Sequence, residues 1–155
     1  PARIIARMNA LNEPSMVAAL YRASCAGVEI DLIVRGACIL RLGLPGVSER
    51  IRVRSVLGRF LEHSRVYWFA NDGRAEIYGS SADWMERNLL RRVEACFPIR
   101  DPRIAARVFR ETLQNYLDDN VQAWLLDADG HYRRATPGDA PAHAAQGWLL
   151  DRYKT

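Results

Sequence analysis

Lysine is almost absent from this 155-residue chain, although the chain is basic overall. Lys154 is the only lysine among 22 basic residues, and the others are arginines. Cysteine is also scarce, because Cys25, Cys38 and Cys96 are odd in number and lie far apart in apolar stretches. This usage argues against a disulfide framework and a zinc knuckle, and it is typical of a reducing compartment, so we expect a cytoplasmic protein.

Long hydrophobic runs are missing as well. No apolar stretch approaches the roughly 20 residues of a membrane span, and the first residues do not predict a signal peptide. Hydrophobic residues make up 49% and charged residues 26%, which is typical of a globular protein and not of a disordered one. The length fits one domain over residues 1–155. Because the chain starts at Pro1 and enters an apolar run at once, we expect a piece of a longer protein, with 128–155 as a terminal hairpin and tail.

The positive charge lies in the first two-thirds of the chain. Residues 1–110 carry 18 arginines against 11 acidic residues, a net charge of +7. Residues 111–155 carry four basic residues against seven acidic ones, a net charge of −3. The front part is therefore expected to attract anions. Arginine suits phosphate, because its planar guanidinium donates two parallel hydrogen bonds.

Hydrophobic periodicity predicts an α/β fold with a mixed sheet flanked by helices. A strand, a helix and a strand follow one another within the first 35 residues and predict a βαβ unit with parallel strands. The predicted strands lie at 3–8, 28–34, 51–56, 65–70, 75–81, 91–99, 121–127 and 131–135. The predicted helices run from Pro14 to Gly27 and onward from Asp101-Pro102, the second with an apolar face of Ile104, Val108, Phe109, Leu113, Tyr116 and Leu117.

Three arginines alternate with apolar residues along the third strand. Arg50, Arg52 and Arg54 share one strand face at a spacing of about 6.6 Å. A row of guanidinium groups at this pitch suits a chain of phosphates. A solvated strand face is the simpler alternative, and we give it more weight.

His63 has the most informative surroundings of the three histidines. It lies just before a predicted strand, beside Arg59 and Arg65. A neutral imidazole can attack phosphorus, and an imidazolium can protonate a leaving oxygen or pair with a phosphate. A surface or structural histidine is the alternative, and it is our interpretation of His131 and His143.

Two predicted strand ends carry polar side chains that suit an anion. Arg35 ends one strand and is followed by Gly36, while Arg7 and Asn9 end the first strand. Ligands bind at the carboxyl ends of parallel strands, so these residues are expected to lie near one another. The alternative for Arg35 is an ordinary surface arginine.

A bend of small residues follows the strand at 75–81. Gly79, Ser80 and Ser81 can bring backbone N–H groups and hydroxyls close to an anion. Asp83, just beyond them, is expected either to orient an imidazole by accepting its N–H or to cap the turn that follows.

Three segments together resemble a known family. These are "ARIIARMNAL", "GVEIDLIVRGACILRLGLPGVSERIRVRSVLGRFLEHSRVYWF" and "YGSSADWMERNLLRRVEACFPIRDP", which resemble the last catalytic domain of bacterial polyphosphate kinases. The resemblance implies a phospholipase D-like fold, whose superfamily carries H-x-K, a following Asp and a G-S-x-N type turn. His63 and "GSSAD" match that pattern, but Arg65 replaces the Lys and Ala70 replaces the Asp. These departures put a hydrolytic phosphodiesterase site in doubt.

The resemblance also implies an activity. Polyphosphate kinases reversibly transfer the terminal phosphate of ATP to polyphosphate through a phosphohistidine, which belongs to a preceding domain absent from this chain. The family's contacts to the ATP phosphates map onto Arg35 and His63, with His63 as a supporting histidine. On strand-end and turn placement alone we add Arg7, Asn9, Ser81, Asp83 and Arg92 as residues that line the site.

Cofactors and partners follow from the same resemblance. ATP, ADP and inorganic polyphosphate are the expected ligands, and no specific nucleic acid is expected. Magnesium ligands are expected outside this chain, and no metal site is expected within it. Family members form homo-oligomers and can associate peripherally with a membrane.

Two other functions remain open at this point. One is a phospholipase D-like phosphodiesterase or nuclease that pairs two copies of the chain. The other is a non-catalytic module that binds polyanions, whose binding would fall steeply with salt.

Overall fold

One mixed eight-stranded sheet organises the computed structural model, which describes residues 2–154. The strands are β1 (Arg3–Met8), β2 (Glu29–Val34), β3 (Ile51–Val56), β4 (Val66–Phe69), β5 (Glu76–Ser80), β6 (Cys96–Pro98), β7 (Ala123–Leu126) and β8 (Tyr132–Arg134). The helices are α1 (Pro14–Cys25), η1 (Asn71–Gly73), α2 (Glu86–Arg91), α3 (Pro102–Val108), η2 (Phe109–Gln114), α4 (Asn115–Leu117) and α5 (Ala145–Tyr153). Among these residues no helix has both the length and the apolar character that a membrane crossing requires.

The strand order is β6-β5-β4-β1-β2-β3-β7-β8. β1, β2 and β3 are parallel neighbours, and every other neighbouring pair is antiparallel. The predicted α/β class with a mixed sheet flanked by helices is therefore confirmed, as is the βαβ unit at its start. The phospholipase D-like likeness stays a prediction.

The first helix forms where its capping residues predict it. The Glu13 carboxylate accepts a hydrogen bond from the Met16 backbone N–H at 2.7 Å, and Pro14 occupies the first turn, where a missing N–H costs nothing. Gly27 follows the helix with φ of +91°, a conformation that a side chain disfavours. These local signals set where the helix begins and ends, so that the chain can re-enter the sheet as β2.

The second predicted helix is present, but its apolar face is not one continuous stripe. Asp101 caps it by accepting from the Arg103 N–H at 2.8 Å. The π-helical segment η2 interrupts the α-helical repeat and rotates the later residues relative to the earlier ones. As a result Leu113 and Tyr116 are fully buried, whereas Ile104 is 53% exposed, contrary to the prediction.

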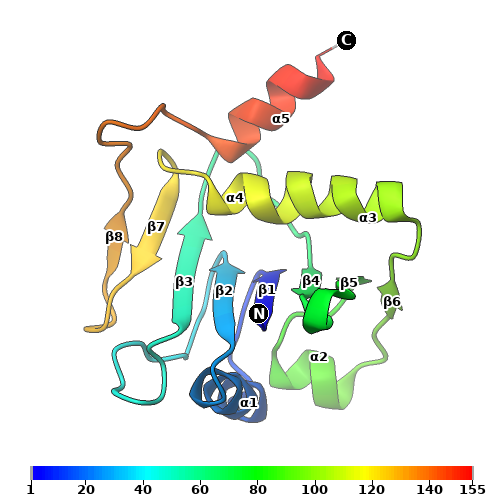
Figure 1. The fold of residues 1–155 in the computed structure, drawn as a ribbon, viewed down its shortest axis with the longest axis vertical. Coiled ribbons are helices and arrows are strands. Elements are labelled where there is room, and N and C mark those ends of the chain that lie inside the picture. The colour runs from blue at the N-terminus through cyan, green and yellow to red at the C-terminus, as the bar shows by residue number, and fades with distance from the viewer. Residues whose placement is uncertain (1, 155) are drawn as a thin grey trace.

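Each face of the sheet carries its own hydrophobic core. Alternation along a strand sends Ala6 and Met8 to one face and Ile5 to the other. The first face packs against α1, and the second packs against η2, α4 and the start of α5. Figure 1 shows α1 and α2 toward the bottom of the view and the α3–α4 segment with α5 toward the top.

The last part of the chain is more than a terminal tail. The predicted hairpin forms as β7 and β8, and β7 pairs with β3, so the hairpin extends the central sheet. Buried Asp119 fastens this region, since Oδ1 accepts from the N–H groups of Val121, Gln122 and Ala123 and Oδ2 accepts from that of Ala145. One carboxylate thus sets the start of β7 and the start of α5.

We predict that Asp119→Ala lowers the free energy of unfolding by about 3 kcal/mol, because buried N–H groups lose their charged acceptor. Asp119→Asn is the matched control. The asparagine oxygen still accepts from the N–H groups of Val121, Gln122 and Ala123, and only the Ala145 N–H loses its acceptor. This variant should therefore lose less free energy of unfolding than Asp119→Ala. Urea unfolding measures both values, and equal losses in the two variants would contradict this account.

Candidate functional site

The carboxyl ends of β1, β2 and β3 lie at one edge of the sheet, because these strands are parallel. β4 starts at the same edge and β5 ends there, since Val66 pairs with both Arg7 and Gly79. The segments that follow β1, β2 and β5 and precede β4 therefore meet at this edge. These segments carry Asn9, Arg35, His63, Ser81 and Asp83, so the topology brings together residues that are far apart in sequence.

Arg35 and Asn9 form a direct pair at this edge. The Arg35 Nε donates to Asn9 Oδ1 at 3.1 Å, and the Gly36 N–H donates to the Asn9 carbonyl at 2.8 Å. A Cβ at position 36 would lie 3.2 Å from that carbonyl oxygen, so glycine allows the close approach. The pairing fixes the half-buried Arg35 guanidinium at the strand ends, which is the position expected for a residue that binds an anion.

His63 lies in the segment 57–65, which runs from β3 to β4. Glu62 and Ser64 on either side of it line a small cavity of about 10 Å³ together with Arg35 and Asn9. The His63 side chain is exposed, and among residues 2–154 its ring makes no hydrogen bond. The structure thus places His63 at the same edge as Arg35, with its ring free of protein partners.

Arg7 points into the protein, and its guanidinium is fully engaged. It forms an ion pair with Glu62 at 3.1 Å, donates to the Thr112 carbonyl at 3.2 Å and lies 3.5 Å from the centre of the Tyr116 ring. It lines the cavity beside Arg35, but only 7% of it is exposed. We therefore remove Arg7 from the expected phosphate contacts, because its charge is matched by Glu62.

Glu62 holds the segment 57–65 against the sheet through its contact with Arg7. Burial alone would raise its pKa, but the hydroxyl of Tyr116, the charge of Arg7 and the amide of Gln146 together lower the pKa below the ordinary value. Burial raises the pKa of Tyr116 to about 12, so Tyr116 remains a neutral donor. The segment that carries His63 therefore has a charged anchor one residue before it.

Asp83 serves neither of its two expected roles. Its Oδ1 accepts from the Asn9 backbone N–H at 2.6 Å, and its Oδ2 accepts from Arg65 at 3.0 Å. Helix α2 instead begins after Met85, without a side-chain cap. Asp83 thus ties the end of β1 to the segment of His63, two residues beyond the imidazole, and leaves the buried Nε of Arg65 without a partner among residues 2–154.

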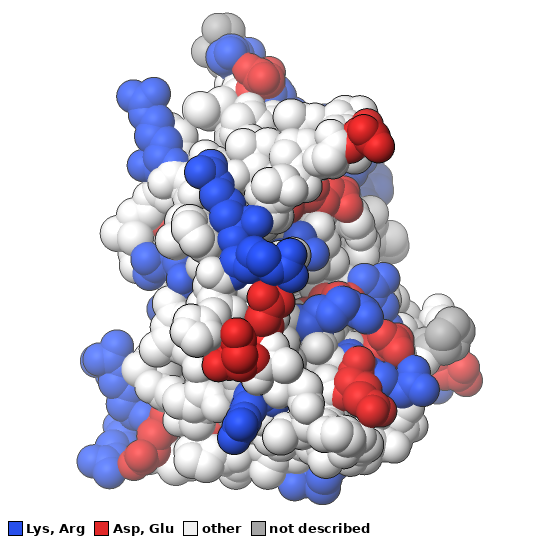
Figure 2. All heavy atoms as spheres, turned by 90° about the vertical axis from the view of Figure 1, so that its left-hand side faces the viewer, with Lys and Arg blue, Asp and Glu red and all other residues white. Residues whose placement is uncertain are grey.

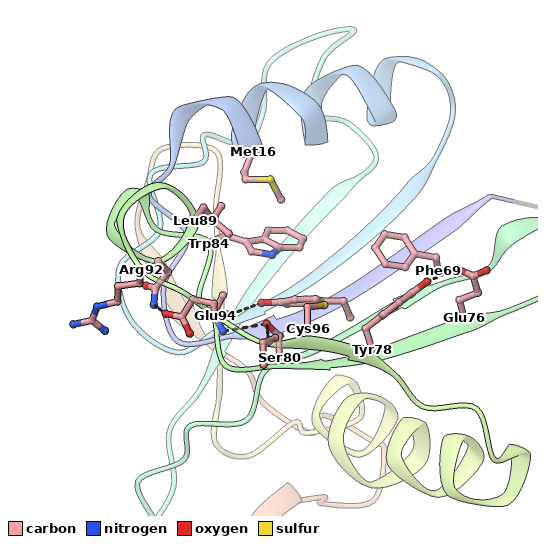
Figure 3. Close-up of a pocket in the computed structure, with 14 residues that line it drawn as sticks. Met16, Phe69, Glu76, Tyr78, Ser80, Trp84, Leu89, Arg92, Glu94 and Cys96 are labelled. Atoms are coloured by element: carbon pink, nitrogen blue, oxygen red, sulfur yellow. Dashed lines mark hydrogen bonds between the residues drawn. The ribbon is translucent and has the colours of Figure 1, made fainter.

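Ser81 and Arg92 belong to a different surface from Arg35. Ser81 donates to the Glu94 carboxylate and accepts from the Ala95 N–H at 2.9 Å. Arg92 and Glu94 line a hollow of about 720 Å³ that shares no lining residue with the cavity beside Arg35. Figure 3 shows the aromatic rings that line it and the Arg92 guanidinium pointing away from it.

Carboxylates make that hollow unsuitable for phosphate. Glu76 and Glu94 lie toward opposite ends of it in Figure 3, and the hydrogen bonds from Ser81 and Asn88 lower the pKa of Glu94 and keep it charged. A polyanion would meet negative charge there. We therefore separate Ser81 and Arg92 from the candidate phosphate site.

The arginine row of β3 is paired and does not form a free track. Arg50 contacts Glu29 at 2.7 Å, and Arg52 contacts both Glu29 and Asp31. Arg54 donates to carbonyls at the end of α4, where the helix dipole favours a cation. The interpretation of the row as a phosphate track is therefore wrong, because the β2 carboxylates neutralise Arg50 and Arg52 and backbone carbonyls hold Arg54. Figure 2 likewise shows acidic side chains among the basic ones on the β8 side of the molecule.

Several residues of this edge were not among those expected from the sequence. Glu62 and Ser64 could have been suspected as direct neighbours of His63, whereas Tyr116 and Gln146 carry no local signal. Within residues 2–154 no group of three His, Cys, Asp or Glu side chains could hold a metal ion. The expected location of magnesium ligands outside this chain stays a prediction.

The geometry defines an α/β domain whose parallel strand ends present the Arg35 guanidinium. A profile of the family described as "Polyphosphate kinase C-terminal domain 2" matches residues 1–146, and the chain belongs to this family. It is 64% identical over 152 residues to a polyphosphate kinase of Xylella fastidiosa and 55% identical over 153 residues to one of Pseudomonas aeruginosa. These alignments cover 97% and 98% of this chain but only 22% of each relative.

A solved structure agrees with these relatives. The crystal structure of polyphosphate kinase from Porphyromonas gingivalis superposes with a TM-score of 0.93 at 38% identity, covering 97% of this chain and 23% of that one. The fold described above is therefore that of a segment found within polyphosphate kinases. The chain spans about a fifth of the length of these relatives.

We predict that Glu62→Gln lowers the free energy of unfolding by about 3 kcal/mol at pH 7, because it leaves the buried Arg7 without a counter-charge. The pKa of Glu62 is lowered by folding, so its stabilisation is present above the unfolded pKa of about 4.3 and is lost as the pH falls through the folded pKa.

The difference between wild type and Glu62→Gln should therefore shrink as the pH is lowered from 7 toward 3. Urea unfolding at several pH values measures it, with the exposed Glu49→Gln as the control. A difference that stays constant over this range would show that the charge of Glu62 is not what stabilises the fold.

Proposed function

We propose that this chain is the phosphate-holding part of a polyphosphate kinase, which transfers the terminal phosphate of ATP reversibly to polyphosphate. Arg35 and His63 contact the phosphates. The observation that carries the proposal is the Arg35 guanidinium, held by Asn9 at the ends of two parallel strands and beside the segment of a free imidazole. The family membership of the chain supports the choice of substrate.

Phosphoryl transfer requires that the residues at this edge position the phosphates and neutralise their charge. Phosphoryl transfer requires little covalent work from the protein, and most of its catalysis comes from donors placed where negative charge develops. The hydrogen bond to Asn9 uses the Nε of Arg35 and leaves its terminal amino groups for phosphate oxygens.

His63 acts as a supporting histidine in this proposal. Its exposed ring contacts a phosphate and takes part in proton transfer, while the phosphorylated histidine lies in another part of the enzyme. Asn9 orients Arg35, and Asp83 orients Asn9 and Arg65, so both are positioning residues. ATP and polyphosphate are the proposed ligands, and magnesium is held by residues outside this chain.

Arg35→Ala, introduced into the full-length enzyme, should lower kcat/KM for ATP by roughly 30- to 1,000-fold, which corresponds to about 2–4 kcal/mol for one well-placed donor. Arg22→Ala removes the same charge from the exposed surface of α1 and should leave kcat/KM within about twofold.

Steady-state kinetics of polyphosphate synthesis provide the measurement. A change of only a few-fold for Arg35→Ala would remove Arg35 from the site. Hydrolysis of a phosphodiester reporter by the purified 155-residue chain would favour a phosphodiesterase instead.

His63→Ala should abolish most polyphosphate synthesis in the full-length enzyme, although the phosphorylated histidine is still present, because the supporting proton donor is lost. The readout is the rate of polyphosphate formation, compared with His131→Ala on the exposed surface. Full activity of the His63 variant would reduce this side chain to a surface residue.

A further inference from the structure

Gln146, at the start of α5, binds the segment of His63 from the opposite end of the sequence. Its Oε1 accepts from the Phe60 N–H and its Nε2 donates to the Phe60 carbonyl, each at 2.9 Å. The same Nε2 donates to Glu62 at 2.9 Å. Only 5% of Gln146 is exposed, so water does not compete for these bonds.

We propose that Gln146 is a positioning residue for His63 and that α5 is thereby part of the phosphate site. This inference rests on the proposed role of His63 in contacting phosphate. It assigns a function to a helix that has no polar contact with Arg35 or with the imidazole itself.

The position of Gln146 is itself fixed by buried hydrogen bonds. The Ala145 N–H donates to Asp119, and the Ala145 carbonyl accepts from Asn115 at 3.1 Å. Ala145 is fully buried in the hydrophobic core between the sheet and the helical segments η2 and α4. The helix therefore presents the Gln146 amide from a rigid base.

Side chains from elsewhere in the fold hold the chain on both sides of His63. Before it, Gln146 bonds to Phe60 and Glu62, and Glu62 also contacts Arg7 and Tyr116. After it, Asp83 bonds to Arg65. A segment whose backbone is already ordered loses less conformational entropy when it binds a ligand. Ordering of this segment before the ligand arrives should therefore increase the affinity for phosphate.

Gly58 offers a second way to test the contact. A Cβ at this position would lie 2.3 Å from Gln146 Oε1 and 2.5 Å from its Cδ. It would also lie 2.9 Å from Gln122 Oε1. All of these atoms end flexible side chains, so Gly58→Ala should displace the Gln146 amide while leaving the sequence of α5 intact. The two variants remove the same contact from opposite sides.

The experiment compares Gln146→Ala, Gly58→Ala and the control Gln114→Ala in the 155-residue chain. Within residues 2–154 the side-chain amide of Gln114 bonds only to the Asp118 carboxylate, so the control removes an equal amide elsewhere. NMR records the amide signals of residues 57–65 and the ring signals of His63, and calorimetry measures the affinity for inorganic polyphosphate. Thermal unfolding reports global stability separately.

We expect both test variants to broaden or shift the signals of 57–65 and of the His63 ring and to weaken polyphosphate binding about tenfold. The control should change neither. If both variants lower only the melting temperature and keep the His63 signals and the affinity, Gln146 is merely structural and the inference fails. If Gln146→Ala does not fold, Gly58→Ala decides by the His63 ring signals and the polyphosphate affinity, because residue 58 lies within the observed segment and shifts its amide signals directly.

The proposed function fails in a different way. Its failure would appear as unchanged polyphosphate affinity in Arg35→Ala and His63→Ala. The signals of 57–65 would still show whether Gln146 orders the segment. Unchanged affinity in the two test variants, together with a loss in Arg35→Ala, would overturn only the role of Gln146.

Discussion

The buried ion pair between Arg7 and Glu62 is the constraint on which the edge of the sheet depends. Arg7 comes from the central strand β1, whereas Glu62 lies in an irregular segment that has no strand partner of its own. A buried charge without its partner is far more costly than a broken surface pair. The pair therefore holds the segment of His63 to the sheet, with Tyr116 covering both groups.

Acidic partners distinguish several arginines from Arg35. Arg7, Arg52 and Arg65 each have an acidic partner in the fold, so their charges stabilise the structure and are not free for a ligand. Arg35 differs, because its partner is the neutral amide of Asn9. Its positive charge is oriented without being cancelled. The proposed phosphate contact therefore combines two features of Arg35, its place at the strand ends and a charge that no carboxylate neutralises.

The strands and the βαβ unit could be predicted from the sequence because their signals are local. Alternating apolar residues and the capping residues Glu13, Pro14 and Asp101 act within a few positions. Strand-end placement likewise predicted that Arg35 and Asn9 meet. The inward turn of Arg7 could not be predicted, because it depends on Tyr116, more than 100 positions later. Gln146 was missed for the same reason, since its partners lie in a segment 84 to 86 residues earlier.

The separation of Arg92 from Arg35 follows from the two faces of the sheet, and Ser81 is bonded to Glu94 beside Arg92. All of these residues lie near one edge, and position along the strands alone cannot tell them apart. Arg7 and Tyr116 lie on the face covered by α4, whereas the hollow with Arg92 and Glu94 includes Met16 of α1. A polyanion that follows the edge thus has Arg35 on one side and the charged Glu94 on the other. If the proposed function holds, repulsion from Glu94 favours a path past Arg35 and His63, and the unequal charge of the two faces then sets the direction in which a phosphate chain crosses the domain.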